Sequence, residues 1–222
     1  GSDSLPTLVF LHGSPGGWNA FEQYMRDKDL LARYRMISID RPGFGYSQFG
    51  DAMNLQDQAN AIAPLIQSFK NTKPVYGVGH SLGGPLVAKL EMDRPDLFSG
   101  LVLLGAPVDA AEEKKERWRY VLNVVPLRYL LPGAFRPSNS ELIYLKKDLK
   151  LMERDWNKIT CPVWIVHGNK DSFVPVGNAY YAEKKLSSSS HKEVLILEGA
   201  RHFIPWEQYD DIKKVLMRLT PL

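Results

Sequence analysis

The sequence lacks several features that would set it apart from ordinary globular proteins. Its 222 residues include one cysteine, Cys161, so no internal disulfide can form. Cys161 precedes Pro162 and an apolar run, which indicates a small buried side chain rather than an activated thiolate. No apolar run reaches the roughly 18 residues that span a bilayer, and no charged-then-apolar signal segment opens the chain. There is no internal repeat either.

A strong charge imbalance is also missing. The 28 Lys and Arg residues nearly balance the 25 Asp and Glu residues, which leaves a net charge of +3. No dense basic run is interleaved with aromatic residues, so nucleic acid is not expected as a partner. The first two residues, Gly1-Ser2, resemble the remnant of an expression vector. An export signal or membrane anchor upstream could have been removed, so localisation is left open.

Short runs rich in Val, Ile and Leu recur along the chain and alternate with amphipathic helical patterns. Such runs are typical of strands that are covered on both faces of a parallel sheet. The alternation predicts an α/β fold with a mostly parallel sheet flanked by helices. The predicted strands are Thr7–Leu11, Arg35–Ile39, Val75–Val78, Leu101–Leu104, Val163–Val166 and Val194–Leu197.

Residues 109–158 interrupt this alternation. They contain no strand-like run, but two amphipathic helical patterns lie at 118–125 and 142–156. We expect a helical cap here, inserted into a core made of residues 1–108 and 159–222. The cap holds 11 Lys and Arg against 8 Asp and Glu, a surplus equal to that of the whole chain. A solvated helical face is the favoured explanation, and attraction of anionic substrates or a membrane surface is the alternative.

The stretch Gly79-His80-Ser81-Leu82-Gly83 lies between a predicted strand and a predicted helix. A reversal this sharp forces strained dihedrals on Ser81 and needs neighbours without side chains, which exposes the serine hydroxyl. The backbone N–H of Leu82, at the helix start, can then bind an anion. The stretch resembles the nucleophile elbow of the α/β-hydrolase family, and the resemblance covers nearly the whole chain. It implies that Ser81 is the nucleophile.

A serine hydroxyl needs a base to accept its proton and a carboxylate to orient that base. Among the five histidines, His202 follows the final predicted strand, where a loop could bring its imidazole over Ser81. The remaining histidines occupy positions that favour packing, turn or surface roles: His12, His80, His167 and His191.

Asp171 is the favoured candidate for the carboxylate. It follows the penultimate predicted strand, a loop that commonly holds the acid in the family that the chain resembles. The chain order Ser81, Asp171, His202 is also the order of those hydrolases. Asp109 follows the strand after the elbow helix, a position that some family members use instead, and it remains the alternative.

Two further loops resemble family loops beside the active site. His12-Gly13-Ser14-Pro15 resembles the loop that supplies a backbone N–H to the oxyanion, which implies Ser14 as the donor together with Leu82. Pro15 has no N–H to offer. The loop from Asp40 to Ser47 is interpreted as structural, with Phe44 as a candidate pocket wall.

The resemblance implies a serine hydrolase that cleaves carboxylic esters of small molecules through an acyl-enzyme on Ser81, without a metal or organic cofactor. A serine at the elbow argues against dehalogenases and epoxide hydrolases of the family, which use a carboxylate nucleophile. Thioester, amide or carbon–carbon bond hydrolysis and perhydrolysis share the same triad and stay open. The alternative outside the enzymes is a ligand-binding receptor that has the same fold but catalyses no reaction.

The pocket and the partners are less constrained by the sequence. Further apolar residues are candidates for an acyl or alcohol pocket, although packing of the cap onto the core is favoured for those in the cap. Only about eleven residues precede the His-Gly loop, so the sheet is expected to have about six strands with 35–39 at its edge. An exposed edge invites a homodimer or a partner that supplies strands. The pocket candidates are Trp118, Val121, Tyr129, Leu130, Phe135 and Phe203.

Overall fold

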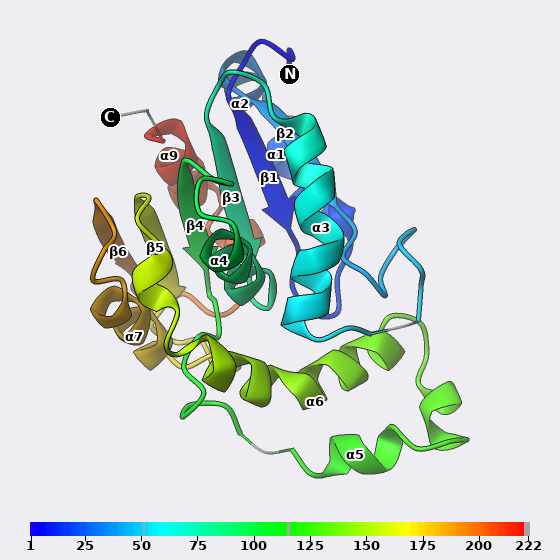
Figure 1. Cartoon of the computed structure of the whole chain (residues 1–222). Coiled ribbons are helices and arrows are strands. Elements are labelled where there is room, and N and C mark those ends of the chain that lie inside the picture. Colours follow the sequence, from blue (N-terminus) through cyan, green and yellow to red (C-terminus); the bar gives the residue numbers. More distant parts are fainter. Residues whose placement is uncertain (51, 115, 220–222) are drawn as a thin grey trace.

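A computed structural model of the chain describes residues 1–50, 52–114 and 116–219. Six strands in these segments form one parallel sheet with the order β2-β1-β3-β4-β5-β6 (Figure 1). All six lie where the apolar runs predicted them, and the predicted fold class is confirmed. The strands are β1 Thr7–Leu11, β2 Arg35–Ile39, β3 Val75–His80, β4 Gly100–Leu104, β5 Val163–Gly168 and β6 Lys192–Leu197.

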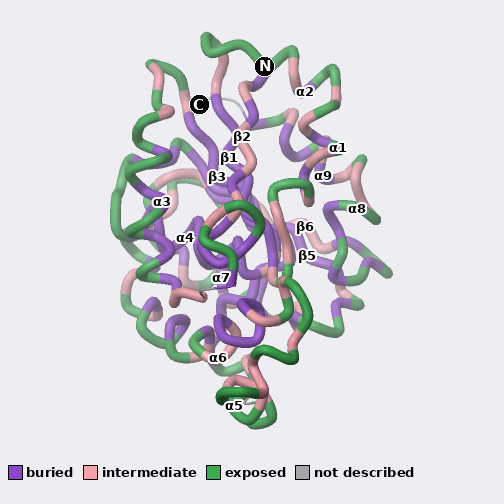
Figure 2. Tube along the Cα trace, turned by 90° about the vertical axis from the view of Figure 1, so that its right-hand side faces the viewer, coloured by how far each residue is buried: buried purple, intermediate pink, exposed green. Residues whose placement is uncertain are grey.

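Helices cover both faces of the sheet and bury a separate apolar cluster on each. Figure 2 shows the sheet between these two layers, and its central strands β1, β3, β4 and β5 are buried along their whole length. One cluster is built on α3 (Leu55–Phe69), α4 (Gly83–Asp93), α6 (Phe135–Met152) and α7 (Gly177–Lys185). The other is built on η1 (Trp18–Phe21), α1 (Glu22–Met25), α2 (Lys28–Arg33), α8 (Ile204–Glu207) and α9 (Tyr209–Met217).

The helix α3 shows how the local sequence sets these elements. Its N-cap Asn54 accepts a hydrogen bond from the backbone N–H of Asp57 at 2.9 Å, which satisfies a donor that the first turn leaves unpaired. Ala59, Ile62 and Ile66 recur on one stripe and are all buried. Capping and apolar spacing together therefore fix both the start of the helix and the face that it turns to the sheet.

Strand β2 forms one edge of the sheet, because its only strand partner in the described segments is β1. This position agrees with the expectation for 35–39. Pairing of a second chain along β2 stays a prediction.

The region between β4 and β5 contains no strand among its described residues, 109–114 and 116–158. It holds α5 (Trp118–Leu122), η2 (Leu127–Leu130), α6 and η3 (Trp156–Lys158). The helix α6 passes below the ends to which the strand arrows point in Figure 1. Its side chains Leu145 and Leu149 are buried in the core. The division into an inserted cap and a core stays a prediction.

The short helix α5 corrects one expectation about this region. Its apolar side chains neither pack onto the core nor line a pocket: Trp118 is 50% exposed and none of the helix is buried. Polar contacts hold α5 to α6 instead, because the Asn139 side-chain amide donates to the carbonyl of Arg119 at 3.0 Å. Figure 2 shows α5 largely exposed at one end of the molecule.

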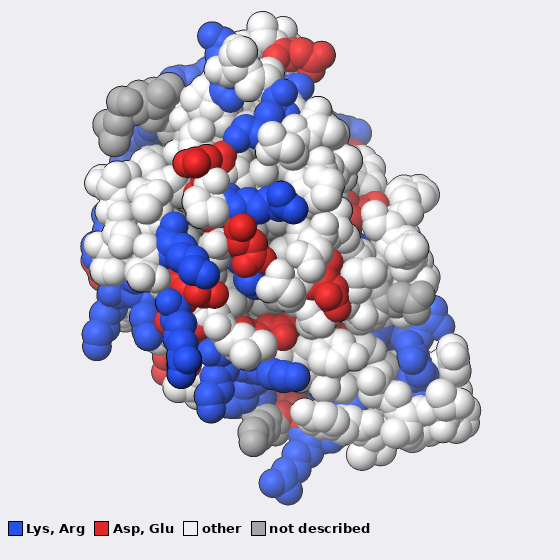
Figure 3. Space-filling model, in the orientation of Figure 1, with Lys and Arg blue, Asp and Glu red and all other residues white. Residues whose placement is uncertain are grey.

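The face drawn in Figure 3 shows how charge is distributed over this region. Lys and Arg gather toward α6 and α7, whereas the surface over α5 is mostly uncharged. None of the described helices is long and apolar enough to cross a bilayer. Contact of the cap with a membrane surface stays a prediction.

Candidate active site

Ser81 occupies a strained turn between β3 and α4, with a φ angle of +50°. Its N–H donates to the carbonyl of Leu104 and its own carbonyl accepts from Gly84, both at 2.8 Å. A Cβ at Gly79 would collide with the carbonyl of Gly83, and a Cβ at Gly83 would collide with the backbone of Leu11. Only glycine fits these two positions, so the sequence holds a serine in a left-handed conformation that non-glycine residues rarely adopt.

The structure brings Ser81, His202 and Asp171 together from the ends of three strands. His202 Nε2 lies 3.0 Å from Ser81 Oγ, and His202 Nδ1 lies 2.6 Å from Asp171 Oδ2. The second oxygen of Asp171 accepts backbone N–H groups from Phe173 and Val174 at 2.9 and 2.8 Å. These contacts leave one hydrogen-bonded line from the carboxylate through the imidazole to the serine hydroxyl.

The electrostatics of Asp171 favour its ionised form. Burial raises the pKa of this carboxyl, but hydrogen bonds from His202 and from the Val174 N–H outweigh burial and bring the pKa below its ordinary value. The alternative acid, Asp109, instead accepts the N–H of Ala111 at 2.8 Å. Of the two candidate carboxylates, the structure therefore places Asp171 on His202.

Two other histidines support this arrangement from below. His80 Nε2 lies 3.1 Å from the carbonyl of His202, and burial, with a smaller electrostatic contribution from the neighbouring His202 ring, lowers the pKa of His80 to about 3. His167 Nε2 lies 2.9 Å from the carbonyl of Val174, in the loop that holds Asp171. Burial lowers the pKa of His167 as well. Both rings are therefore neutral donors that fix the backbone of the two site loops.

The predicted oxyanion donors lie on either side of Ser81. Leu82 is the N-cap residue of α4, and Ser14 lies in the loop that follows β1. That loop lies directly against the turn, because a Cβ at Gly13 would be 2.9 Å from Ser81 Cβ. Ser14 Oγ donates to Ser138 Oγ on α6 at 2.9 Å, so α6 contacts this loop. The catalytic use of both N–H groups stays a prediction.

A cavity of about 1200 Å³ opens above Ser81. It is lined by Ser14, Ser81, Leu82 and His202, and by apolar side chains that include Phe135 from α6 and the predicted Phe203. Phe173 and Phe203 place their rings 5.4 and 5.6 Å from the imidazole of His202. Ser81 and His202 therefore lie in the wall of a partly apolar cavity.

The predicted pocket residues Phe44 and Trp118 do not line this cavity, which corrects the expectation for both. Phe44 is fully buried, with its ring packed edge-on against His12 and below the Arg41 guanidinium. The ring of Trp118 lies 4.4 Å from the guanidinium of Arg119 on the exposed face of α5. Neither position could be read from the sequence, because both depend on how separate segments pack.

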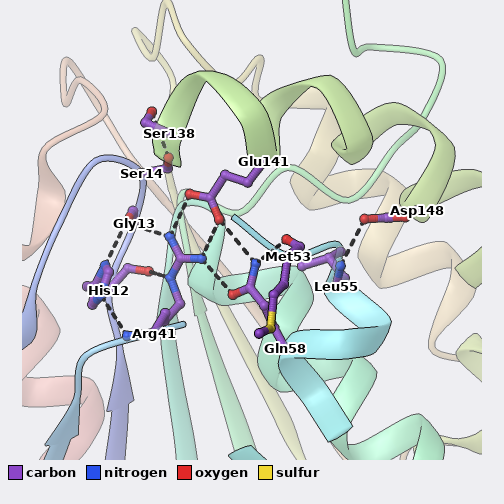
Figure 4. Close-up of polar contacts among 10 residues, drawn as sticks. All are labelled: His12, Gly13, Ser14, Arg41, Met53, Leu55, Gln58, Ser138, Glu141 and Asp148. Carbon is purple, nitrogen blue, oxygen red and sulfur yellow. Dashed lines mark hydrogen bonds and ion pairs between the residues drawn. The ribbon is translucent and has the colours of Figure 1, made fainter. Parts of the chain in front are cut away.

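The sequence did not predict the buried polar cluster beside the Ser14 loop, although Arg41 belongs to the 40–47 loop that was interpreted as structural. Arg41, Gln58 and Glu141 are all buried here and hydrogen-bonded to one another (Figure 4). The signal for its partner was on α6, where Glu141 stands four residues before Leu145 on the apolar stripe. A charged residue on an apolar stripe indicates a buried partner. Among the described residues, no group of His, Cys, Asp and Glu could hold a metal ion.

Comparison with known proteins agrees with this geometry. A 1-acylglycerol-3-phosphate O-acyltransferase of Arabidopsis thaliana is 31% identical over 148 residues, 61% of this chain, and this chain spans 34% of that protein. The monoglyceride lipase of Rattus norvegicus is 24% identical across 99% of this chain and 82% of the lipase.

A solved structure shares this fold, and part of the sequence matches the model of a protein family. The structure of an esterase from Exiguobacterium antarcticum superposes with a TM-score of 0.78 at 21% identity, over 96% of this chain and 90% of the esterase. Residues 6–139 match the family described as alpha/beta hydrolase fold, more than half of the chain. The chain belongs to the alpha/beta hydrolase fold family.

Proposed function

We propose that the protein is a serine hydrolase that cleaves carboxylic esters through an acyl-enzyme on Ser81. The observation that carries this proposal is the line of hydrogen bonds from Asp171 through His202 to Ser81, which ends in the wall of the large cavity. A serine hydroxyl is a weak nucleophile unless a base accepts its proton, and this line supplies both the base and the group that orients it.

A residue of the site can be assigned to each step of the proposed reaction. Ser81 Oγ attacks the ester carbonyl while His202 Nε2 accepts its proton and later donates that proton to the leaving alcohol. Asp171 holds the imidazole through Nδ1–H and stabilises its positive charge. The N–H groups of Ser14 and Leu82 bind the developing oxyanion, and water activated by His202 then releases the acid.

The comparisons support esters of acyl chains as the substrate class. Relatives with similar sequences are monoglyceride lipases, and a solved structure of the same fold is an esterase. The cavity also has an apolar side made by Phe135, Leu142 and Leu145. The same triad could also hydrolyse thioesters, amides and carbon–carbon bonds. We propose esters because these relatives are named as a lipase or an esterase.

The direct test is a panel of nitrophenyl esters from acetyl to palmitoyl, assayed with wild type, Ser81→Ala and Ser68→Ala. Ser68 lies exposed on α3 and provides the control serine. We expect hydrolysis by wild type and Ser68→Ala and none by Ser81→Ala. Labelling by a fluorophosphonate probe should follow the same pattern. Folded wild type that binds an ester but neither hydrolyses it nor reacts with the probe would instead support the receptor alternative.

A further inference from the structure

The Arg41 side chain is fully buried beside the loop that carries Ser14, and every N–H of its guanidinium is used (Figure 4). Arg41 Nε donates to the carbonyl of His12 at 2.8 Å, and Nη2 donates to the carbonyl of Gly13 at 2.9 Å. The other three donors reach Gln58 Oε1 and both carboxylate oxygens of Glu141 at 2.7–2.9 Å. Since arginine has five N–H donors in a rigid plane, these bonds allow the guanidinium one orientation.

The bond to Gly13 acts directly on the predicted oxyanion donor. The carbonyl of Gly13 and the N–H of Ser14 belong to one planar peptide unit, in which the two groups point in opposite directions. Two donors hold that carbonyl: Arg41 Nη2 and, at 2.7 Å, His12 Nδ1. Fixing the carbonyl oxygen therefore fixes the direction of the Ser14 N–H. The same bonds polarise the peptide and make its N–H a stronger donor.

His12 is confined to the tautomer that this arrangement needs. Its Nε2 accepts the backbone N–H of Arg41 at 3.0 Å, which leaves Nδ1 as the donor to Gly13. Burial and the adjacent Arg41 charge lower the pKa of His12 well below its ordinary value, so the ring stays neutral. The Gly13 carbonyl in the Ser14 loop thus accepts two oriented hydrogen bonds, one from His12 at the end of β1 and one from Arg41.

The carboxylate that holds the Arg41 guanidinium belongs to the predicted cap. Glu141 lies on α6, a hundred residues further along the chain, and binds Arg41 through both of its oxygens at 2.7 and 2.9 Å. Gln58 of α3 closes the cluster with a bond of 3.1 Å to Glu141. A buried ion pair of this kind contributes little net stability compared with apolar packing. Its geometric effect is definite, because it ties the position of the cap helix to the oxyanion loop.

We propose that Arg41 and Glu141 are positioning residues for ester hydrolysis: the cap helix α6, through Glu141 and Arg41, aims the Ser14 N–H at the oxyanion. This inference rests on the proposed function. It predicts that the pair acts on the transition state and hardly on ground-state binding, because the oxyanion forms only when Ser81 attacks.

The test compares Glu141→Gln with Asp148→Asn. Asp148 is also on α6 and also joins the cap to the core, by accepting the N–H of Leu55 at 2.9 Å, but it contacts no part of the Ser14 loop in the described structure. For Glu141→Gln we expect kcat to fall about 10- to 100-fold with KM unchanged, the effect of a donor displaced by up to 1 Å. The Ki of a trifluoromethyl ketone, which forms a tetrahedral oxyanion on Ser81, should rise in proportion. Asp148→Asn should change neither quantity.

Amide hydrogen exchange provides a readout that does not need activity. Exchange in a peptide spanning residues 12–18 should accelerate in Glu141→Gln and stay at the wild-type rate in Asp148→Asn. If Glu141→Gln does not fold, Arg41→Lys is subject to the same comparison, because it keeps a buried positive charge beside Glu141 but loses the bidentate geometry and the bond to Gly13.

Equal effects of the Glu141 and Asp148 substitutions on kcat, Ki and exchange would overturn the proposal, since both residues would then act only as structural contacts. A rise in KM with kcat unchanged would overturn it as well. Wild-type protein that neither hydrolyses esters nor reacts with fluorophosphonate would refute the proposed function instead. The exchange comparison would still decide whether the cap holds the Ser14 loop.

Discussion

The buried ring of His80 predicts a specific dependence of stability on pH. Burial lowers the pKa of His80 from 6.5 to about 3 in the folded protein. Between these two values the unfolded chain binds a proton that the folded protein excludes, so the free energy of unfolding decreases as the pH falls through this window. One excluded proton corresponds to a slope of about 1.4 kcal/mol per pH unit, and the accumulated loss from pH 8 to pH 5 is about 2 kcal/mol.

The substitution His80→Gln isolates this contribution. Gln keeps an N–H that can donate to the carbonyl of His202, the bond that His80 Nε2 makes at 3.1 Å, but it does not titrate. His12 and His167 also have lowered pKa values, and they remain in both proteins. The difference between variant and wild type therefore reports His80 alone. Asp171 does not titrate in the assayed range of pH 5 to 8, because its pKa is lower than the ordinary 3.8.

The assay is urea unfolding followed by tryptophan fluorescence at pH 8, 7, 6 and 5, with the free energy of unfolding extrapolated at each pH. We expect the variant to be less stable than or equal to wild type at pH 8 and to gain about 2 kcal/mol relative to wild type by pH 5. Parallel curves for the two proteins would refute the reasoning. Titration of the folded-state His80 ring near pH 6 by NMR would refute it independently.

Three further predictions follow from the site and its scaffold. Asp171→Asn should lower kcat for ester hydrolysis about 10⁴-fold, because the imidazole of His202 loses its orienting acceptor. Asp109→Asn should leave kcat unchanged, and equal effects of the two substitutions would contradict the assignment of the acid. Gly83→Ala should destabilise the protein by about 1–3 kcal/mol in urea unfolding, because the added Cβ would collide with the carbonyl of Leu11. A variant as stable as wild type would contradict that packing. Leu149→Ala, at a fully buried position of α6, should cost about 2–5 kcal/mol, and a loss near zero would show that α6 is not packed into the core.

The strands and the elbow could be predicted because their signals are local. Apolar runs such as Val163–Val166 are too continuous for a surface helix, and parallel strands buried on both faces require such runs. The glycines around Ser81 are equally local, since the turn itself excludes side chains at Gly79 and Gly83. The choice of His202 was possible because the carboxyl ends of parallel strands meet at one edge of the sheet.

The surroundings of the site could not be predicted, because they depend on packing between distant segments. Phe44 and Trp118 both looked suitable for a pocket, but one is buried under Arg41 and the other lies exposed on α5. An aromatic side chain has the same sequence signature in a core, in a pocket and on a surface.

The sequence by itself determined the candidate groups for the proposed chemistry: a serine on a strained turn, a histidine and an aspartate after later strands, and a loop whose N–H we propose for the oxyanion. Backbone sterics and strand order fix these features within short stretches of chain. Only the tertiary structure decided which carboxylate reaches His202 and that Arg41 and Glu141 meet across a hundred residues. Such pairings depend on the relative placement of whole elements, which no local pattern encodes.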